Sequence, residues 1–391
     1  MMRFNRILQI NLPRKQSAFL WGARKTGKST YLKTSFPESI YFDFLQTDLY
    51  FKLLKQPSLL REMIFAYGEN QLRNPIVIDE VQKVPHILDE IHWLIENKDL
   101  SFILCGSSAR KLKRGQANLL GGRAWRFSMH PLTSVEIGNI ELLRVLNQGL
   151  IPDHYLQEPE QAKMSLKAYV DDYLKEEIIA EALVRNIPSF TRFMDALPYS
   201  MGELTNYSDI ARDCAVDAKT VREYFQILVD TLIAYRIDPF KKRQSRQVIT
   251  KSPKYYLFDV GVASYMCKRW VHEEKGEQFG KAFEHFIFME IIAYRSYKNY
   301  DFNIHFWRTK TGIEVDFILD NGDNGSVAIE VKGKHNIDQR DLQNLRIFNE
   351  EFEPKKSILV CNEGIKRVSG KIEILPWRQF LDDLWNDRIV G

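Results

Sequence analysis

The residues Gly22-Ala23-Arg24-Lys25-Thr26-Gly27-Lys28-Ser29 match the phosphate-binding pattern G-x-x-x-x-G-K-[ST] at every fixed position. The apolar run Ser17–Trp21 before them predicts a buried strand, and Ser29–Leu32 predicts the first turn of a helix. A strand, a glycine loop and a helix in this order turn backbone N–H groups and a helix N-terminus toward a phosphate. The stretch therefore predicts a P-loop in an α/β sheet; the alternative is a surface turn rich in Gly and Lys.

This P-loop predicts ATP and Mg²⁺ as cofactors. Lys28 is expected to reach the β- and γ-phosphates, and Ser29 is expected to ligate Mg²⁺. The residues expected to contact the nucleotide are Gly22, Ala23, Arg24, Lys25, Thr26, Gly27, Lys28, Ser29 and Thr30.

A second apolar run ends in two carboxylates, as a nucleotide site requires. Pro75–Ile78 precedes Asp79 and Glu80, and such a run is typical of a central parallel strand buried on both faces. Ligands bind at the carboxyl ends of strands in these sheets. Asp79 is therefore expected to hold Mg²⁺ and Glu80 to polarise the attacking water; the alternative is a strand that ends in an acidic turn.

Composition indicates a folded, mildly basic protein of several domains. The chain has 391 residues, a formal net charge of +4 and four scattered cysteines, so neither a disulfide framework nor a zinc cluster is expected. We find no apolar run of bilayer length and no signal core at the N-terminus, and we expect a cytoplasmic protein without membrane contact. The predicted units are an α/β nucleotide-binding domain at 1–133, a helical lid at 134–197, a winged helix at 198–270 and an α/β domain at 271–391.

The third unit has the order of a winged helix. A helix around Asp209–Arg212, a turn at Ala215–Ala218 and a second helix at Lys219–Leu228 precede two strands. The strands flank a basic segment, Lys241–Arg246. Together with Lys219 and Arg222 of the second helix, this segment predicts contacts with DNA phosphates, and the alternative is a winged helix used only for packing.

The last unit carries a third group of chemically active residues. Glu284 lies in a helical stretch, Asp316 in a strand, and Glu330 and Lys332 in the strand that follows the turn Asn321–Gly325. Period two places Glu330 and Lys332 on one face, and the hairpin brings Asp316 beside Glu330. Two carboxylates and a lysine can bind Mg²⁺ and activate water against a phosphodiester, with Glu284 as a further metal ligand. This D…E-x-K order is that of the restriction-endonuclease-like fold; the alternative is a charged surface hairpin.

The chain resembles a bacterial and archaeal family of AAA+ ATPases with an N-terminal AAA module and a C-terminal DUF4143 domain. The resemblance extends over nearly the whole chain and is carried by Gly22–Ser29, Ile78–Gln82, Gly106–Arg110, Gly122–Ala124, Pro131–Thr133, Lys251–Gly261, Phe283–Glu284, Phe306–Thr309, Glu314–Phe317 and Glu330–Lys332. It implies ATP binding, DNA handling and, more weakly, nuclease activity.

The resemblance to AAA+ proteins also implies two further residues of the ATP site. Ser107, after the apolar run Leu100–Cys105, corresponds to the polar residue that senses the γ-phosphate or the water, with Ser108 as the alternative. Arg123, just before the run Trp125–Met129, corresponds to the arginine finger that completes a neighbouring copy's site in a homo-oligomer. A surface arginine that caps a turn is the alternative.

Two hypotheses about function follow from the sequence. In the first, an ATPase uses its nucleotide state to control a C-terminal half that binds DNA, and whether this half also cleaves DNA is left open. In the second, an ATP-dependent switch or scaffold uses the winged helix and a catalytically inactive nuclease-like domain only for packing or partner binding.

Overall fold

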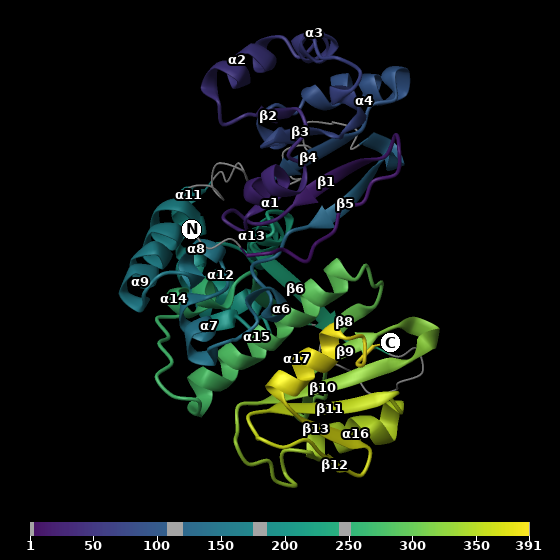
Figure 1. Cartoon of the computed structure of the whole chain (residues 1–391). Coiled ribbons are helices and arrows are strands. Elements are labelled where there is room, and N and C mark those ends of the chain that lie inside the picture. Colours follow the sequence, from purple (N-terminus) through teal and green to yellow (C-terminus); the bar gives the residue numbers. More distant parts are fainter. Residues whose placement is uncertain (1–3, 108–119, 175–185, 242–251, 391) are drawn as a thin grey trace. The chain divides into compact units, whose positions relative to one another are not determined.

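The computed structural model describes residues 4–107, 120–174, 186–241 and 252–390, which form two compact units. The first unit contains the described residues up to Leu132 together with Gln226–Ile233, and the second contains the others. Figure 1 labels their helices and strands. Because each unit has its own sheet, each is described separately.

The first unit is built on a parallel sheet with the strand order β2-β3-β4-β1-β5. Its strands are β1 (Ser17–Trp21), β2 (Tyr41–Asp43), β3 (Ile76–Asp79), β4 (Phe102–Gly106) and β5 (Ala124–Ser128). Its helices are α1 (Lys28–Ser35), α2 (Thr47–Lys55), α3 (Leu59–Phe65) and α4 (Ile87–Lys98), with short 3₁₀ turns η1 (Gln71–Arg73), η2 (Val81–Lys83) and η3 (Leu120–Gly122). The P-loop strand and helix are thus present as predicted.

The parallel register brings the carboxyl ends of these strands to one edge of the sheet. Trp21, the last residue of β1, is level with Gly106 of β4 and with Ser128 of β5. β1 lies between β4 and β5, although β2 follows it in the chain, so the strand order reverses beside β1. Ligands of open α/β sheets bind at the carboxyl edge of such a reversal.

Burial of both faces explains why the central strands are continuous apolar runs. β1, β3 and β4 are buried along their whole length, as expected for strands covered on two sides. The Phe19 and Trp21 rings on one face stack with centroids 5.1 Å apart. α4 contributes Ile87, Ile91 and Leu94 to the same core, so its apolar stripe covers that face.

The second unit begins with a helical region that includes the predicted lid. The helices of the second unit are α6 (Ser134–Ile137), α7 (Leu142–Gln148), α8 (Pro152–Tyr155), α9 (Pro159–Lys167), the π-helical η4 (Ala168–Leu174), α11 (Ile187–Ala196), η5 (Leu197–Ser200), α12 (Tyr207–Cys214), α14 (Val260–Met266), α15 (Gly276–Tyr297), α16 (Gln343–Phe352) and α17 (Trp377–Trp385). The helix α13 (Ala218–Asp230) begins in the second unit, and its residues from Gln226 onward belong to the first.

Buried polar contacts join the predicted lid segment to the C-terminal half. Glu290 of α15 accepts hydrogen bonds from Ser134 N at 2.8 Å, Ser134 Oγ at 2.7 Å and Trp385 Nε1 at 2.7 Å. Burial raises the pKa of Glu290 to about 7. Asp259 accepts from Leu150 N at 2.7 Å and caps α14 by accepting from Val262 N at 2.9 Å. The described residues of this segment are mainly helical, and they belong to the second unit.

A helix–turn–helix followed by two strands appears in the predicted order. Asn206 caps α12 by accepting from Ser208 N at 3.1 Å, and Asp217 starts α13 by accepting from Thr220 N at 2.7 Å. Between them Ala215 adopts a left-handed φ of 52°. β6 and β7 pair antiparallel after these helices, whereas the segment 242–246 of the expected basic tip lies outside the described residues.

The second sheet has the strand order β12-β13-β11-β10-β9-β8-β6-β7. Its strands are β6 (Ala234–Pro239), β7 (Lys254–Leu257), β8 (Asn303–Arg308), β9 (Glu314–Asp320), β10 (Ser326–Lys332), β11 (Lys356–Cys361), β12 (Arg367–Ser369) and β13 (Ile372–Pro376). β9 and β10 form the predicted hairpin through the turn η6 (Gly322–Asn324), where Asn321 N donates to Gly325 O at 3.1 Å.

This sheet continues across the boundary expected at residue 270. Asp238 of β6 pairs in parallel with His305 of β8, so the strands that follow the helix–turn–helix belong to the same sheet as the C-terminal strands. The long helix α15, green in Figure 1, packs on one face through Phe288 against Phe317 at 5.7 Å. α16 packs on the other face through Phe348 against Trp307 at 5.4 Å. The division of the chain into four domains stays a prediction.

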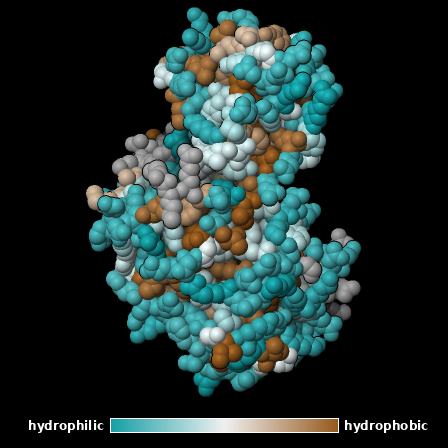
Figure 2. Space-filling view, viewed as in Figure 1, coloured by the Kyte–Doolittle hydropathy of each residue, from teal (hydrophilic) through white to brown (hydrophobic). Residues whose placement is uncertain are grey.

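The molecular surface is mainly hydrophilic on the face that Figure 2 shows, with apolar side chains exposed in separate groups. No helix in the described part of the chain combines the length and the apolar character needed to cross a membrane.

Candidate functional site

The P-loop has a backbone that only glycine allows at two positions. Gly27, which precedes α1, has a φ of 93°, in the left-handed region that glycine tolerates. A Cβ on Gly22 would lie 2.4 Å from Met129 O, because the chain after β5 passes directly over the loop. Both glycines of the motif are thus required by local geometry.

The Lys28 ammonium lies inside the loop. Its Nζ donates to Gly22 O at 2.8 Å and to Ala23 O at 3.0 Å, and the side chain is buried. Thr26 Oγ1 also donates to Ala23 O, at 2.8 Å. Among the other predicted nucleotide contacts, Lys25 and Thr30 are exposed, whereas Arg24 and Ser29 are half-buried.

An arginine near the N-terminus fixes the loop from outside. Arg6 Nη1 donates to Thr26 O at 2.6 Å, and its Nη2 donates to His130 O at 2.6 Å and to Pro131 O at 3.3 Å. This side chain therefore joins the P-loop to the segment that follows β5. The sequence contains no motif around Arg6, so pattern reasoning missed it.

A tyrosine hydroxyl lies between the two expected Mg²⁺ ligands of the ATP site. Tyr41 of β2 donates to Asp79 Oδ2 at 2.5 Å and also interacts with the Ser29 side chain. Burial and the neighbouring Asp79 carboxylate raise the pKa of Tyr41. A hydroxyl and a carboxylate are hard oxygen ligands of the kind that Mg²⁺ prefers. Ser29 and Asp79 thus fit the metal.

Glu80 is held by a glutamine that also contacts the predicted sensor. Gln82 Nε2 donates to Glu80 Oε2 at 2.5 Å and to Ser107 Oγ at 3.1 Å, and all three side chains are buried. Glu80 itself has a left-handed φ of 58°, which turns the chain sharply after β3. A Cβ on Gly106 would lie 2.3 Å from Gln82 Oε1, so only a glycine at the end of β4 leaves room for the Gln82 amide. Ser108 lies outside the described residues.

Arg123 lies at the opposite edge of the sheet from the P-loop. It precedes β5, whose first residue Ala124 is level with Ser17 at the amino end of β1. Its guanidinium forms an ion pair with Glu96 of α4. Arg123 therefore does not contribute to its own copy's ATP site, and an arginine-finger role would require a second copy.

The C-terminal hairpin brings Asp316, Glu330 and Lys332 together. Lys332 Nζ contacts Glu330 Oε1 at 2.7 Å, and Asp316 Oδ2 accepts from Val331 N at 2.8 Å. Asn344 of α16 also donates to Glu330 Oε1, at 3.3 Å. Glu330 is 1 % exposed, and its Oε2 has no hydrogen-bond partner in the described part of the chain.

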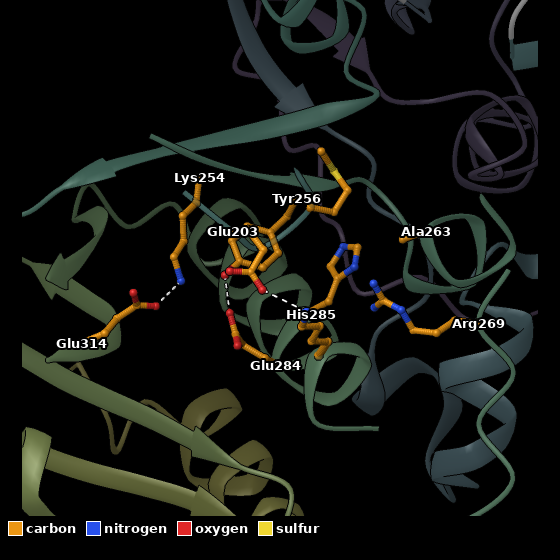
Figure 3. A pocket seen from close by; sticks show the side chains of 11 residues that line it. Glu203, Lys254, Tyr256, Ala263, Arg269, Glu284, His285 and Glu314 are labelled. Carbon is orange, nitrogen blue, oxygen red and sulfur yellow. Dashed lines mark hydrogen bonds and ion pairs between the residues drawn. The ribbon is translucent and has the colours of Figure 1, made fainter. Parts of the chain in front are cut away.

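Glu284 lines an adjoining pocket with residues that the sequence did not single out. Figure 3 shows Tyr256, Lys254 and Glu314 around it. Tyr256 donates to Glu284 Oε1 at 2.5 Å, Lys254 forms an ion pair with Glu314, and Arg308 contacts Glu314 at 2.6 Å. Lys254 comes from β7, so the hairpin after the helix–turn–helix contributes a cation to this group.

Burial and mutual repulsion raise the pKa values of these carboxyl groups. Burial and then Asp316 raise the pKa of Glu330 to about 8, against the opposing effect of Lys332. Burial and then Asp316 raise the pKa of Glu284 to about 7, against Lys254. Burial lowers the pKa of Lys254, but Glu284 and the other carboxylates raise it more, so the net shift is upward.

This group fits a metal only in part. Asp316 and Glu330 offer two carboxylates with one buried unpartnered oxygen, and Mg²⁺ is commonly held by one or two carboxylates with water. Within the described ranges, however, no three His, Cys, Asp or Glu side chains are grouped closely enough to hold a metal. Glu284 as a third metal ligand stays a prediction.

The predicted DNA contacts that the structure describes are exposed. Lys219 and Arg222 project from α13, and Lys241 follows β6. The Arg222 guanidinium lies over the Tyr207 ring, 4.9 Å from its centroid. These three side chains are therefore accessible to phosphates.

The residues missed from the sequence are those whose roles depend on tertiary proximity. They are Arg6, Tyr41, Gln82, Lys254 and Tyr256. Gln82 and Lys254 stand within motifs that carry the family resemblance. The available signals were a polar residue two positions after the predicted catalytic Glu80 and a lysine at the start of an apolar run.

The fold and the P-loop geometry define an AAA+ nucleotide-binding domain, and the family comparisons agree. Residues 14–138 match the family described as AAA domain, and residues 279–380 match a domain of unknown function, DUF4143. Residues 140–271 match another domain of unknown function, DUF8612. The chain thus combines an N-terminal ATP-binding AAA domain with a C-terminal DUF4143 domain, as the resemblance implied.

Curated relatives are described only as uncharacterized proteins. Proteins of Mycobacterium bovis and Mycobacterium tuberculosis are each 25 % identical over 256 residues, which is 63 % of this chain and 56 % of theirs. The match therefore spans only a little over half the length of these relatives. A Haemophilus influenzae protein is 22 % identical over 336 residues, 77 % of this chain and 79 % of its own.

Among solved structures, the chain is similar to the Orc1 protein of Aeropyrum pernix in complex with DNA. The sequence identity is 12 %, and the match covers 65 % of this chain and 86 % of that one. Its TM-score is 0.30, too low to support a structural argument.

Replacement of Gln82 by alanine is expected to slow ATP hydrolysis without preventing ATP binding. The change removes the amide that holds Glu80 beside Ser107. Loss of a group that orients a functional side chain typically costs at least about tenfold, so kcat should fall on the order of tenfold. Steady-state hydrolysis and equilibrium nucleotide binding would measure the two effects. The exposed Gln46→Ala variant serves as the control, and a wild-type kcat for Gln82→Ala would refute the role of the amide.

Proposed function

We propose that this protein hydrolyses ATP and that its nucleotide state controls DNA binding by the second unit. The observation that carries the ATPase proposal is the alignment of Lys28, Asp79 and Glu80 along one sheet edge, with Gln82 joining Glu80 to Ser107 at 2.5 and 3.1 Å. Phosphate binding, charge neutralisation and water activation need these groups at adjacent positions.

Each residue of the ATP site has a defined task in this proposal. Lys28 leaves the carbonyls of Gly22 and Ala23 and binds the β- and γ-phosphates. Bound Mg²⁺ would neutralise charge between these phosphates. Glu80 orients and polarises the attacking water, and Gln82 positions Glu80 relative to Ser107.

The location of Arg123 supports a homo-oligomer in which one copy completes the next copy's ATP site. The guanidinium lies at the amino edge of the sheet, away from its own P-loop, and it is 38 % exposed. To act on a neighbouring copy's site, the Arg123 guanidinium would have to break its ion pair with Glu96. This ion pair is exposed to solvent and therefore contributes little stability.

DNA binding is proposed for the helix–turn–helix and its hairpin. Lys219 and Arg222 are exposed on the second helix, the one that enters the groove in such motifs. The joining of β6 to β8 connects this module to the sheet that carries Asp316 and Glu330.

A second candidate function is hydrolysis of a phosphodiester at Asp316, Glu330 and Lys332. The buried unpartnered oxygen of Glu330 favours it, because such an atom is costly unless a cation or proton completes it. Mg²⁺ or Mn²⁺ would supply polarisation of the phosphodiester there. In the rival hypothesis the protein is an ATP-dependent switch, and this group has no catalytic role. Lys254 and Lys332 then serve only to neutralise the charge of the carboxylates.

Lys28→Ala is expected to abolish tight ATP binding, whereas Glu80→Gln should bind ATP and hydrolyse it about a hundredfold more slowly or worse. The first change removes the cation inside the loop, and the second removes the water-polarising charge at constant size. Binding of a fluorescent ATP analogue and phosphate release would be measured on both. Wild-type hydrolysis by Glu80→Gln would refute its assignment.

The same variants test the shared site. Mixing Arg123→Ala with Glu80→Gln should restore part of the turnover, since a mixed pair contains one intact Glu80 facing one intact Arg123. Absence of rescue together with a monomeric mass in ATP would exclude the homo-oligomer.

Lys219→Ala and Arg222→Ala are each expected to weaken duplex DNA binding similarly for all sequences and to lower the slope of log K against log salt by about one. Titrations at several salt concentrations would measure this, with exposed Lys55→Ala as the matched control. Unchanged affinity in the double variant would favour a winged helix used only for packing.

Asp316→Asn and Lys332→Ala are expected to remove any Mg²⁺- or Mn²⁺-dependent DNA cleavage while ATP hydrolysis stays intact, because the two centres lie in separate units. Asp320→Asn, at the far end of the same strand, should cleave like the wild type. Cleavage of single-stranded, double-stranded and branched DNA would be assayed with and without ATP. If the wild type cuts none of them, the nuclease proposal fails.

A further inference from the structure

The second unit contains a large cavity that none of the roles above uses. Its volume is about 630 Å³, and α9, α11, η5 and α14 form its walls. Small-molecule sites occupy about 300–1,000 Å³. The cavity can therefore take a nucleobase with its sugar, whereas a stacked base pair within a duplex could not enter it.

Aromatic side chains and cations both line this cavity. Its aromatic residues are Tyr199, Tyr265 and Trp270, and its cations are Lys163, Lys268 and Arg269. Tyr199 is 84 % exposed, an unusual exposure for an aromatic side chain. Lys163 Nζ lies over the Trp270 ring, 5.7 Å from its centroid. Aromatic faces beside exposed cations are the combination that binds unstacked bases together with their phosphates.

The wall that carries Trp270 is rigidly held. Asn147 is buried and exchanges two hydrogen bonds of 2.8 Å with the Val271 backbone. Arg269 N donates to Ser264 O at 2.8 Å, and Lys268 adopts a left-handed φ of 50°. The backbone that carries the Trp270 ring is thus held in place before any ligand arrives, which lowers the entropy cost of stacking.

Two carboxylates, Asp171 and Asp195, also line the cavity. Asp171 Oδ2 accepts from the Tyr265 hydroxyl at 3.4 Å. Carboxylates accept hydrogen bonds from N–H groups on base edges, such as the N3–H of thymine or an exocyclic amino group. With three cations against two carboxylates, the cavity suits a ligand that has an anionic backbone and a base edge with donor groups, and it does not suit a purely anionic ligand.

The cavity adjoins the pocket of Glu284 through one shared side chain. Arg269 lines both, and Figure 3 shows it beside His285 on the side of that pocket away from Lys254 and Glu314. Lys281, on the same helix as Glu284, also lines the Glu284 pocket. A strand whose base occupies the large cavity would therefore have Arg269 and Lys281 as phosphate contacts on the way to Glu284.

We propose that this cavity binds an unstacked base of a single-stranded nucleic acid and guides the adjoining backbone past Arg269 toward Glu284. The direction of the strand rests on the proposed phosphodiester role of the Asp316 group, but the binding of the base does not. A base held here selects single strands, because duplex bases are paired and stacked.

The test uses the full-length protein and a fluorescently labelled 12-nucleotide oligothymidylate. The wild type should bind it with quenching of tryptophan fluorescence, and Trp270→Ala should weaken binding by about fivefold or more, the lower end of one lost base stack. Trp270→Phe should retain most of the affinity, which separates stacking from misfolding. Trp93→Ala is the matched control, since Trp93 is also partly exposed under a cation, with Arg61 5.0 Å from its ring.

An oligonucleotide of equal length with abasic sites distinguishes binding of the base from binding of the phosphate backbone. The wild type should bind it more weakly than oligothymidylate, and Trp270→Ala should bind it as the wild type does. Equal binding of oligothymidylate by the wild type and Trp270→Ala would overturn the proposal, as would duplex binding with the same dependence on Trp270. Failure of the wild type to bind the oligomer would also overturn the proposal, and a peptide would then be the ligand to test in the cavity.

The variant Asp316→Asn distinguishes failure of this proposal from failure of the nuclease proposal. This variant should keep the oligothymidylate affinity and the fluorescence quenching even if wild-type cleavage is never detected. Loss of oligomer binding in Asp316→Asn, with the fold intact, would place the single strand at the carboxylates instead of in the cavity.

Discussion

The parallel pairing of β1 with β4 and β5 is the constraint on which the ATP site depends. Because β1 lies between these strands in register, the P-loop, the end of β3 and the end of β4 all open on one edge. A strand that slipped by one residue would turn its buried side chains to the wrong face. The positions of Lys28, Glu80 and Ser107 are thus consequences of backbone pairing before any side chain contributes.

Side-chain contacts then refine this arrangement with groups that carry no catalytic charge. Gln82 fixes Glu80 and Ser107, Tyr41 lies between Ser29 and Asp79, and Arg6 holds the loop itself. The hydrogen bonds of Gln82 are buried and those of Tyr41 and Arg6 are partly buried, so the loss of Gln82 leaves buried polar atoms unsatisfied. The second unit has a comparable organisation, in which Lys254, Lys332 and Tyr256 balance four carboxyl groups that would otherwise repel one another.

Local patterns in the sequence were sufficient to predict the helices and strands, but not which distant residues and strands they contact. The P-loop, the strand ending at Asp79 and the Asp316–Glu330 hairpin could be predicted, because apolar runs and their polar ends lie within a few residues of one another. Arg6 and Tyr41 could not be assigned, since each acts on a loop or carboxylate 20 or 38 residues away. The parallel pairing of β6 with β8 was also missed, because the two strands are separated by two helices and no local period encodes their meeting. For the same reason the helices between residues 134 and 174 were predictable, whereas their packing against the C-terminal half was not.

The pairing of β6 with β8 has a practical meaning for dissecting the protein. A fragment that starts after residue 270 would carry β8 as an exposed sheet edge, with N–H and C=O groups available to other chains. It would also lack Lys254 and Tyr256, so Glu284 and Glu314 would lose a buried counter-charge and a hydroxyl donor. A soluble C-terminal fragment therefore has to begin upstream of β6, and aggregation of shorter fragments would reflect where the chain was cut and not an inherent lack of folding.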